Sequence, residues 1–339
     1  MATMLFLALE SSCDETSAAV FNSDLQILSN VVASQTELHA RFGGVVPEIA
    51  ARAHVRNLLP VIEEALERAN ITLNQIGCIA VHNTPGLVGA LLISVSAAKM
   101  FALALGVPLV AVNHVHSHIY AARIAAGRDI FPCVGLVVSG GHTSLFQCES
   151  ALSLNLLGGT RDDAAGEAFD KVAAMLGLGF PGGPALEREA RNGNPKAYAF
   201  PRSFADNERL EFSFSGVKTS VLYACHGYNV SKGTPPPSGQ KRADLAASFQ
   251  EAVVDVLAIK CMQAIRKSKF KRLAVGGGVS ANMRLRQKLE EMAAKEGVEL
   301  FIPPLNLCTD NAAMAALAVE KWKLGEFAAE DLDAEPNFA

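Results

Sequence analysis

The order of predicted strands and helices repeats once along the chain. Residues 5–9, 17–21 and 25–33 are three short β-rich runs separated by turn residues, and a helix–strand–helix run follows them. Residues 134–139, 144–148 and 153–157 begin the same order again. In each set the first strand ends in a polar turn. The repeat predicts a duplicated α/β fold of two lobes, with these two turns facing each other across a central cleft.

The later helices are less evenly spaced. They are predicted at residues 164–176, 184–192, 242–267, 281–295 and 311–323. Residues 200–239 are predicted to be the least regular part, and a Pro-Pro-Pro run at its end predicts an exposed, mobile loop at 233–239. The second lobe therefore carries an irregular insertion.

Composition fits a globular protein of this size. The 339 residues are half hydrophobic and 19% charged, and their net charge of −4 disfavours a protein that coats nucleic acid on its own. The seven cysteines form no C-x-x-C pair, which argues against a disulfide framework. No leader precedes the first strand, so we expect a cytoplasmic protein with no membrane contact. The apolar run 87–108 is expected to be a buried helix.

Three of the eight histidines lie within residues 114–118, between a predicted strand and a predicted helix. If the helix begins at His114, then His114 and His118 share a face and His116 points away from them. Two histidines at this spacing provide half of a transition-metal site. The alternative is that one histidine packs or caps while the others are solvated.

Two glycine-rich turns could let the backbone approach a ligand. Gly276, Gly278 and Ala281 match the dinucleotide pattern G-x-G-x-x-G/A. The next strand ends in prolines and not in an acid, which favours a base or ribose site over nicotinamide. Around Gly140 and Gly141, backbone amides could bind phosphate oxygens or an acyl group. In each case a turn that simply needs glycine is the alternative.

Acidic residues lie in three predicted turns. The pair at 162–163 begins a helix, where capping explains it, whereas Asp170 lies too far along for a cap and could bind ribose or Mg²⁺. Position alone favours Asp310 as an N-cap, although a histidine pair needs a third, usually carboxylate, ligand. Asp14 and Glu15 in the first turn could bind Mg²⁺, act as a base, or shape the turn.

Together these motifs resemble the tRNA N6-adenosine threonylcarbamoyltransferase (TsaD) family, once labelled sialoglycoprotein endopeptidases. The resemblance runs in order through nearly the whole chain, except residues 329–339 and the Pro-Pro-Pro loop. The motifs that carry it are Glu10-Ser-Ser-Cys-Asp-Glu-Thr16, His39-Ala-Arg-Phe-Gly-Gly-Val-Val-Pro-Glu48, Thr84-Pro-Gly-Leu-Val-Gly89, Asn113-His-x-x-x-His118, Val138-Ser-Gly-Gly-His-Thr143, Asp162-Asp-Ala-Ala-Gly-Glu-Ala-Phe-Asp-Lys171, Phe180-Pro-Gly-Gly-Pro184, Phe212-Ser-Phe-Ser-Gly-x-Lys218, Gly276-Gly-Gly-Val-Ser-Ala-Asn282 and Cys308-Thr-Asp-Asn311.

The resemblance implies an actin-like fold of the sugar kinase/Hsp70 type. Its lobes would be residues 1–112 with 312–339, and residues 113–311 with the insertion at about 200–240. It also implies a metal-dependent acyltransferase. This enzyme would transfer threonylcarbamoyl from threonylcarbamoyl-adenylate to N6 of adenosine 37, in tRNAs that read codons beginning with A, and so form t6A.

The resemblance also implies the site residues. The metal ligands would be His114, His118 and Asp310, which suit Fe²⁺ or Zn²⁺ equally, and Mg²⁺ could accompany the nucleotide. His116 is not a ligand in the family pattern. The adenylate site would comprise Val138, Ser139, Gly140, Gly141 and His142 for the phosphate and acyl portions, Asp170 and Glu187 for the ribose, and Gly183 and Asn282 near the base and sugar. We predict Asp14, with Glu15 beside it, as the catalytic acid pair that takes the N6 proton.

The family works with a paralogous actin-like subunit (TsaB type) and a small ATPase (TsaE type). Helices 47–69 and 87–105 form the candidate partner face. The candidate contacts to tRNA phosphates are Arg41, Arg52, Arg56 and residues 267–272. For each group the alternative is an ordinary solvated face.

Three other functions are weighed against this one. A zincin-type metallopeptidase needs His-Glu-x-x-His, but Val115 follows His114. A small-molecule kinase of the same fold would not explain a His–His–Asp site. A non-catalytic paralogue would be expected to lack both the histidine pair and the 276–282 glycine loop.

Overall fold

The computed structural model describes residues 3–227 and 235–337, and the chain divides into two compact units. The first unit is Met1–Arg128 with Thr309–Ala339, and the second is Asp129–Cys308. The boundaries differ from the predicted 112 and 311. Helix α4 (His114–Ala126), which the sequence assigned to the second lobe, belongs to the first unit because it packs against the 3₁₀ helix η4 (Ala312–Leu317).

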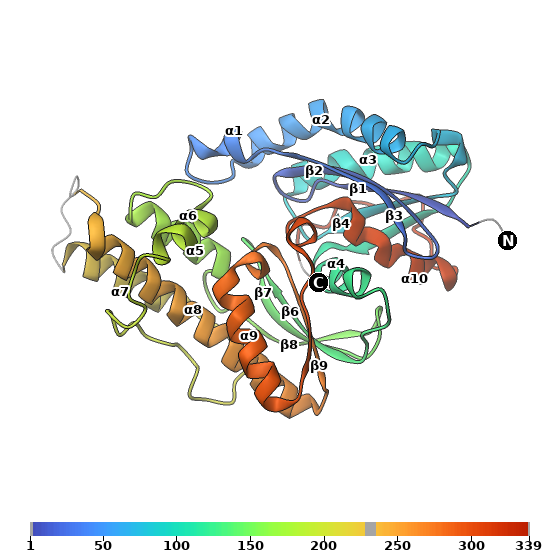
Figure 1. Cartoon of the computed structure of the whole chain (residues 1–339). Coiled ribbons are helices and arrows are strands. Elements are labelled where there is room, and N and C mark those ends of the chain that lie inside the picture. Colours follow the sequence, from blue (N-terminus) through green and yellow to red (C-terminus); the bar gives the residue numbers. More distant parts are fainter. Residues whose placement is uncertain (1–2, 228–234, 338–339) are drawn as a thin grey trace. The chain divides into compact units, whose positions relative to one another are not determined.

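A five-stranded sheet in the order β3-β2-β1-β4-β5 forms the centre of the first unit (Figure 1). β1 (Leu5–Glu10), β2 (Glu15–Asn22) and β3 (Ile27–Ser34) are antiparallel to one another, whereas β4 (Cys78–Thr84) and β5 (Leu109–Asn113) run parallel to β1. Residues 5–9 of β1 and 78–81 of β4 are apolar without a break, because both faces of the sheet are covered.

Helices cover both faces of this sheet. α2 (Pro47–Arg68) and α3 (Val88–Leu105) lie on one face, where they share a core with Leu7 and Leu9 of β1. On the other face, Phe6 packs edge-on against Trp322 of α10 (Ala318–Lys323). The unit also contains α1 (Thr36–Ala40) and the 3₁₀ helix η1 (Leu73–Gln75). The side chains of β1 alternate between these two faces, so one strand anchors both layers.

Helix α3 was expected to be buried, but only one of its faces is. Among the described residues, it is the single helix that is long and apolar enough to cross a membrane by length and composition. Val95, Ala98 and Phe101 lie in the core, whereas Met100 is 49% and Leu103 is 84% exposed. The prediction was wrong for the outer face, which leaves apolar side chains open for contact.

The second unit repeats the strand order of the first. Its sheet runs β10-β9-β6-β7-β8, with β6 antiparallel to β7 and parallel to β9 (Figure 1). The strands are β6 (Cys133–Val138), β7 (Thr143–Cys148), β8 (Leu154–Gly159), β9 (Arg272–Gly276) and β10 (Glu299–Phe301). The α-helices are α5 (Ala165–Met175), α6 (Gly182–Ala190), α7 (Ser215–His226), α8 (Gly239–Ser268) and α9 (Met283–Glu296), and the 3₁₀ helices are η2 (Gly278–Ala281) and η3 (Leu305–Leu307). The duplicated α/β order is confirmed.

Helix α7 lies inside the segment that was predicted to be irregular. Its first turn is capped from a distance, because Asp162 accepts hydrogen bonds from the Phe214 and Ser215 amides at 2.8 and 3.3 Å and from the Ser213 hydroxyl at 2.6 Å. The sequence analysis assigned Asp162 to its own helix, so this capping was missed. Of the loop predicted at 233–239, residues 233–234 lie outside the described residues, and 235–238 have no regular structure.

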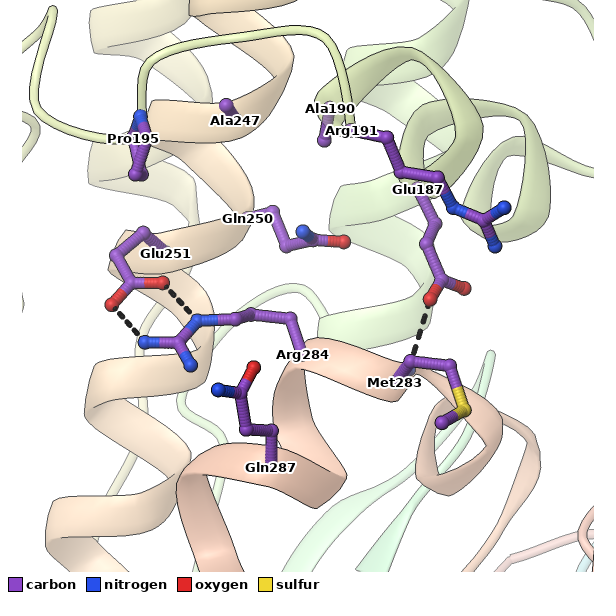
Figure 2. A pocket seen from close by; sticks show the side chains of 10 residues that line it. All are labelled: Glu187, Ala190, Arg191, Pro195, Ala247, Gln250, Glu251, Met283, Arg284 and Gln287. Carbon is purple, nitrogen blue, oxygen red and sulfur yellow. Dashed lines mark hydrogen bonds and ion pairs between the residues drawn. The ribbon is translucent and has the colours of Figure 1, made fainter. Parts of the chain in front are cut away.

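Helices α8 and α9 are joined by a charged clamp. Glu251 of α8 accepts hydrogen bonds from Arg284 at 2.6 and 2.8 Å (Figure 2). It also accepts one from Lys288 at 3.0 Å. The Arg284 hydrogen bonds, reinforced by Lys288, lower the pKa of Glu251 to about 2. The clamp therefore stabilises the native state only while Glu251 is ionised.

We expect Glu251→Gln to lower the free energy of unfolding by about 1–2 kcal/mol at neutral pH. The folded-state pKa lies below the ordinary value of 4.5, so the stabilisation is complete above that value and is lost as the pH falls toward about 2. Urea unfolding at a series of pH values measures the difference. Glu290→Gln, an exposed position on α9, is the control. A pH-independent difference between E251Q and the native chain would contradict the clamp.

Candidate metal centre and nucleotide site

Two histidines and one aspartate converge in the first unit. Helix α4 begins at His114, since the Asn113 side chain accepts from the His116 amide at 3.0 Å, and this start sets His114 and His118 on one face. Nε2 of His118 lies 3.2 Å and Nε2 of His114 lies 3.5 Å from Oδ1 of Asp310. The structure brings together the three residues that the sequence singled out as ligands.

The geometry of these three side chains fits a metal ion. In a tetrahedral site with ligand bonds of about 2.0–2.1 Å, adjacent donor atoms lie about 3.3–3.4 Å apart, close to the two distances found here. His118 is fully buried, and its Nε2 faces Oδ1 of Asp310 at 3.2 Å. Two imidazoles and a carboxylate held together in a buried site are a common donor set for a transition-metal ion.

Asp310 does not cap the last helix. η4 begins at Ala312 and its N-cap residue is Asn311, so position alone favoured the wrong role for Asp310. Burial by itself would raise the pKa of Asp310, but the neighbouring imidazoles of His114 and His118 hold it below its ordinary value. The carboxylate is therefore ionised and available as a ligand.

A second carboxylate lies behind His114 and was missed by the sequence analysis. Glu10, at the end of β1, is completely buried, and its Oε2 lies 2.6 Å from Nδ1 of His82 and 3.0 Å from Nδ1 of His114. Burial would raise the pKa of Glu10, but His82 and His114 lower it well below its ordinary value. Conversely, the charges of Asp310 and Glu10 outweigh burial and raise the pKa of His114 to about 9. The one available signal was an acid ending an otherwise apolar strand.

The acidic turn after β1 also belongs to this unit. The backbone of Asp14 accepts from the Gln35 amide at 3.1 Å, and Glu15 accepts from the Ser34 hydroxyl at 3.1 Å. Burial, followed by the charges of Asp14 and Asp310, raises the pKa of Glu15 to about 9. At neutral pH Glu15 is therefore a hydrogen-bond donor and not a base.

In the second unit, the turn after β6 forms an open backbone cradle. Ser139 and His142 close it through a 2.8 Å backbone hydrogen bond, and nothing lies within 4 Å of the space above Gly140 and Gly141. Gly277, at φ +93°, passes so close to β6 that an added Cβ would lie 2.4 Å from the Val138 carbonyl oxygen. The two glycine turns thus pack together and leave uncrowded backbone for a ligand.

The remaining predicted nucleotide residues hold the ends of helices. Asp170 accepts from the Gly182 amide at 2.7 Å, next to Gly183 in α6. Glu187 accepts from the Met283 amide at 2.9 Å. Asn282 caps α9 through Leu285 at 3.0 Å and donates to Oε1 of Gln250 at 2.8 Å. These contacts fix the side chains around one region of the second unit.

A pocket of about 480 Å³ opens among these helices. Gln250 and Glu187 point toward each other across it, and Arg284 lies below them in its pair with Glu251 (Figure 2). The pocket is lined by Glu187, Ala190, Arg191, Pro195, Ala247, Gln250, Glu251, Met283, Arg284 and Gln287. Sequence reasoning found Glu187 and missed Gln250, because a glutamine inside a long amphipathic helix carries no pattern of its own.

The structure therefore gathers the predicted residues into two sets. Asp14, Glu15 and the three candidate metal ligands lie in the first unit, and every predicted adenylate residue lies in the second.

Solved structures of other proteins share the fold. One is full-length HypF in its phosphate- and nucleotide-bound form. The match covers 96% of this chain and 56% of the HypF chain, with a TM-score of 0.63 and 13% sequence identity. The match to component A of the Acidaminococcus fermentans (R)-2-hydroxyglutaryl-CoA dehydratase covers 94% of this chain and 98% of that chain, with a TM-score of 0.54 and 17% identity. These actin-like relatives confirm the predicted fold class.

Other proteins are much more similar to this chain in sequence than these solved structures are. The chain is 50% identical to the tRNA N6-adenosine threonylcarbamoyltransferase of Rhodopirellula baltica, over 99% of this chain and 97% of that protein. It is 50% identical to the enzyme of the same name from Syntrophobacter fumaroxidans, over 99% of this chain and 100% of that protein. The family model TsaD, tRNA N6-adenosine threonylcarbamoyltransferase, matches residues 26–317. The chain therefore belongs to the TsaD family of tRNA-modifying transferases.

Proposed function

We propose that this chain transfers the threonylcarbamoyl group of threonylcarbamoyl-adenylate to N6 of adenosine 37, in tRNAs that read codons beginning with A, and so forms t6A. Family membership supports the reaction class. The observation that carries the proposal is that the Nε2 atoms of His114 and His118 both lie within 3.5 Å of Oδ1 of Asp310. We place the reaction in the cytoplasm, in agreement with seven free cysteines.

The two histidines and Asp310 would hold one Fe²⁺ or Zn²⁺ through nitrogen and oxygen ligands. When bound, such an ion supplies Lewis-acid polarisation of the donor's threonyl or carbamoyl oxygens. Three protein ligands leave room for substrate, as catalytic metal sites require. The protein's own contribution is to hold the three donor atoms at separations that suit the ion.

The second unit would bind the adenylate. The amides around Gly140 and Gly141 would receive the phosphate and acyl oxygens, and Asp170 would accept from the ribose. Gln250 would meet the base: because its Oε1 accepts from Asn282, its amide NH₂ is left to donate to a ring nitrogen. Mg²⁺ accompanying the nucleotide would add charge neutralisation at the phosphate.

The transfer itself needs no covalent enzyme intermediate. N6 of the adenosine attacks the carbamoyl carbon, the bond to the phosphate oxygen breaks, and AMP leaves. The N6 proton passes to the Asp14 carboxylate, and Glu15, protonated at neutral pH, donates a hydrogen bond beside it. Arg41, Arg52 and Arg56 are exposed and would contact tRNA phosphates.

The outer faces of α2 and α3 would bind a paralogous actin-like subunit of TsaB type, with a TsaE-type ATPase joining the assembly. Val55 and Leu59 of α2 are 61% and 55% exposed, and Leu92 and Leu103 of α3 are 41% and 84% exposed. Apolar side chains gathered on two adjacent helices suit a helical partner surface.

His118→Ala should lower the bound metal from about one ion per chain to near zero and abolish t6A formation, because a His–Asp pair binds a divalent ion far more weakly. Metal analysis and mass analysis of tRNA nucleosides, made with purified partners, test this. His116→Ala, on the other face of α4, should retain both. A metal-free H118A that still forms t6A at the native rate would remove the metal from the proposal.

Gln250→Leu should weaken binding of AMP, used as the probe, about 10-fold, since one hydrogen bond is lost and the Asn282 amide is left unpaired. Calorimetric titration measures the affinity. Gln240→Leu, on the same helix but outside the pocket, should bind AMP normally. Equal affinities for both variants would place the base elsewhere.

Leu103→Asp should abolish binding of the paralogous subunit without changing the melting temperature, because the side chain is 84% exposed. Light scattering of the mixed subunits detects the complex. Leu324→Asp, 65% exposed in the same unit, should leave the complex intact. If L103D still forms the complex, the partner occupies another surface.

A further inference from the structure

The buried carboxylate of Glu10 organises the imidazoles around it. Its Oε2 lies 2.6 Å from Nδ1 of His82 and 3.0 Å from Nδ1 of His114, and its Oε1 accepts from the Ser12 amide. Glu10 and His82 are fully buried, and residue His114 is 4% exposed. Water therefore does not compete for these contacts, and their geometry is fixed by the ends of β1, β4 and β5.

A carboxylate can only accept, so each imidazole must direct an N–H toward it. Nδ1 of His114 therefore keeps its proton. Nε2 of the same ring, which lies 3.5 Å from Asp310, is the nitrogen that binds an ion once its own proton is released. The hydroxyl of Ser12, 3.1 Å from Nδ1, assists only as a second acceptor.

We propose that Glu10 is a positioning residue of the metal site: it holds His114 as the Nδ1–H tautomer with Nε2 directed at the ion, and His82 holds Glu10 in place. The inference rests on the metal site proposed above. Ligating histidines commonly donate their second ring N–H to a carboxylate, which fixes the ring and increases its basicity as a ligand.

Burying the His82 ring is unfavourable, and its contact with Glu10 explains why the ring is buried there. Its Nε2 is buried without a hydrogen-bond partner in the described part of the chain, and the ring packs edge-on against His114 at 5.6 Å between centroids. A buried ring nitrogen of this kind is tolerated where the rest of the ring is needed. Here Nδ1 lies 2.6 Å from Oε2 of Glu10, and this buried contact limits how far the carboxylate can turn away from His114.

Glu10→Gln tests the proposal on the full chain. The variant keeps the size of the side chain, but its amide can accept through one oxygen only and turns N–H groups toward the rings. We expect Zn²⁺ and Co²⁺ to bind about 10–100-fold more weakly, measured by competition with a chromophoric chelator. His82→Phe keeps a ring in place and removes its donor, and we expect a smaller loss in the same direction.

A second measurement reports the tautomer directly in the metal-free protein. With ¹⁵N-labelled histidine, NMR distinguishes Nδ1–H from Nε2–H, and His114→Gln identifies the signals of that ring. At pH values above 9, where the His114 ring is neutral, we expect Nδ1–H in the native chain and a mixture in E10Q. A merely structural role for Glu10 would lower the melting temperature without moving these signals.

Glu320→Gln is the matched control. Glu320 is a partly buried carboxylate that also contacts α4, through the Tyr120 hydroxyl at 2.6 Å. Its replacement should change neither metal affinity nor the His114 tautomer. The inference is overturned if E10Q binds Zn²⁺ within twofold of the native chain with an unchanged tautomer, or if the native chain binds a second ion through Nδ1 of His114.

The outcomes separate this inference from the proposed function. If E10Q does not fold, H82F carries the same two measurements. If the native chain binds no metal, the metal proposal fails, and the tautomer in the metal-free protein alone decides the role of Glu10. If the acyl donor is another compound, metal affinity and tautomer are unaffected.

Discussion

The burial of one ionised carboxylate at the end of β1 is the interaction on which the first unit's site depends. A charge removed from water is tolerated only if it is neutralised and fully hydrogen-bonded. Glu10 meets this condition because β1 pairs with β4, which carries His82, and β4 pairs with β5, which leads directly into His114. The order of three adjacent parallel strands thus brings residues far apart in sequence onto one carboxylate. His114 is shared with the candidate metal site, which adds two further residues, His118 and Asp310.

The turn after the first strand of each unit lies at the same point of the duplicated fold, but the two turns suit ligands of opposite charge. In the first unit, the strand that starts the repeat ends in Glu10 and an acidic turn, with Asp310 nearby, which suits a cation. In the second unit, the corresponding strand β6 ends in a turn whose glycines leave bare amides, which suits an anion. The same strand order therefore supports two chemistries, because the backbone fixes where the turn lies and the side chains decide what it binds.

Local patterns carried the sequence predictions that are confirmed. The repeat of strand order and the shared face of His114 and His118 both follow from periodicities of a few residues, and the actin-like fold follows from the repeat together with the family motifs. The predictions failed where a residue's role depends on a contact with a residue far away in the sequence. Asp162 caps α7 from about 50 residues away, α4 joins the first unit through η4, and His82 looked like one more residue of a buried strand. None of these contacts leaves a signal at its own position in the sequence.

The geometry also bears on the peptidase alternative. A zincin places a glutamate directly after its first histidine, on the metal's side, where it activates water. Here Val115 follows His114, and Glu10 contacts Nδ1, the ring nitrogen that does not face Asp310. Glu10 therefore does not fill the role that peptide hydrolysis requires. A group-transfer reaction makes no such demand, because the adenylate already carries a good leaving group and the acceptor amine needs only to be positioned and relieved of one proton.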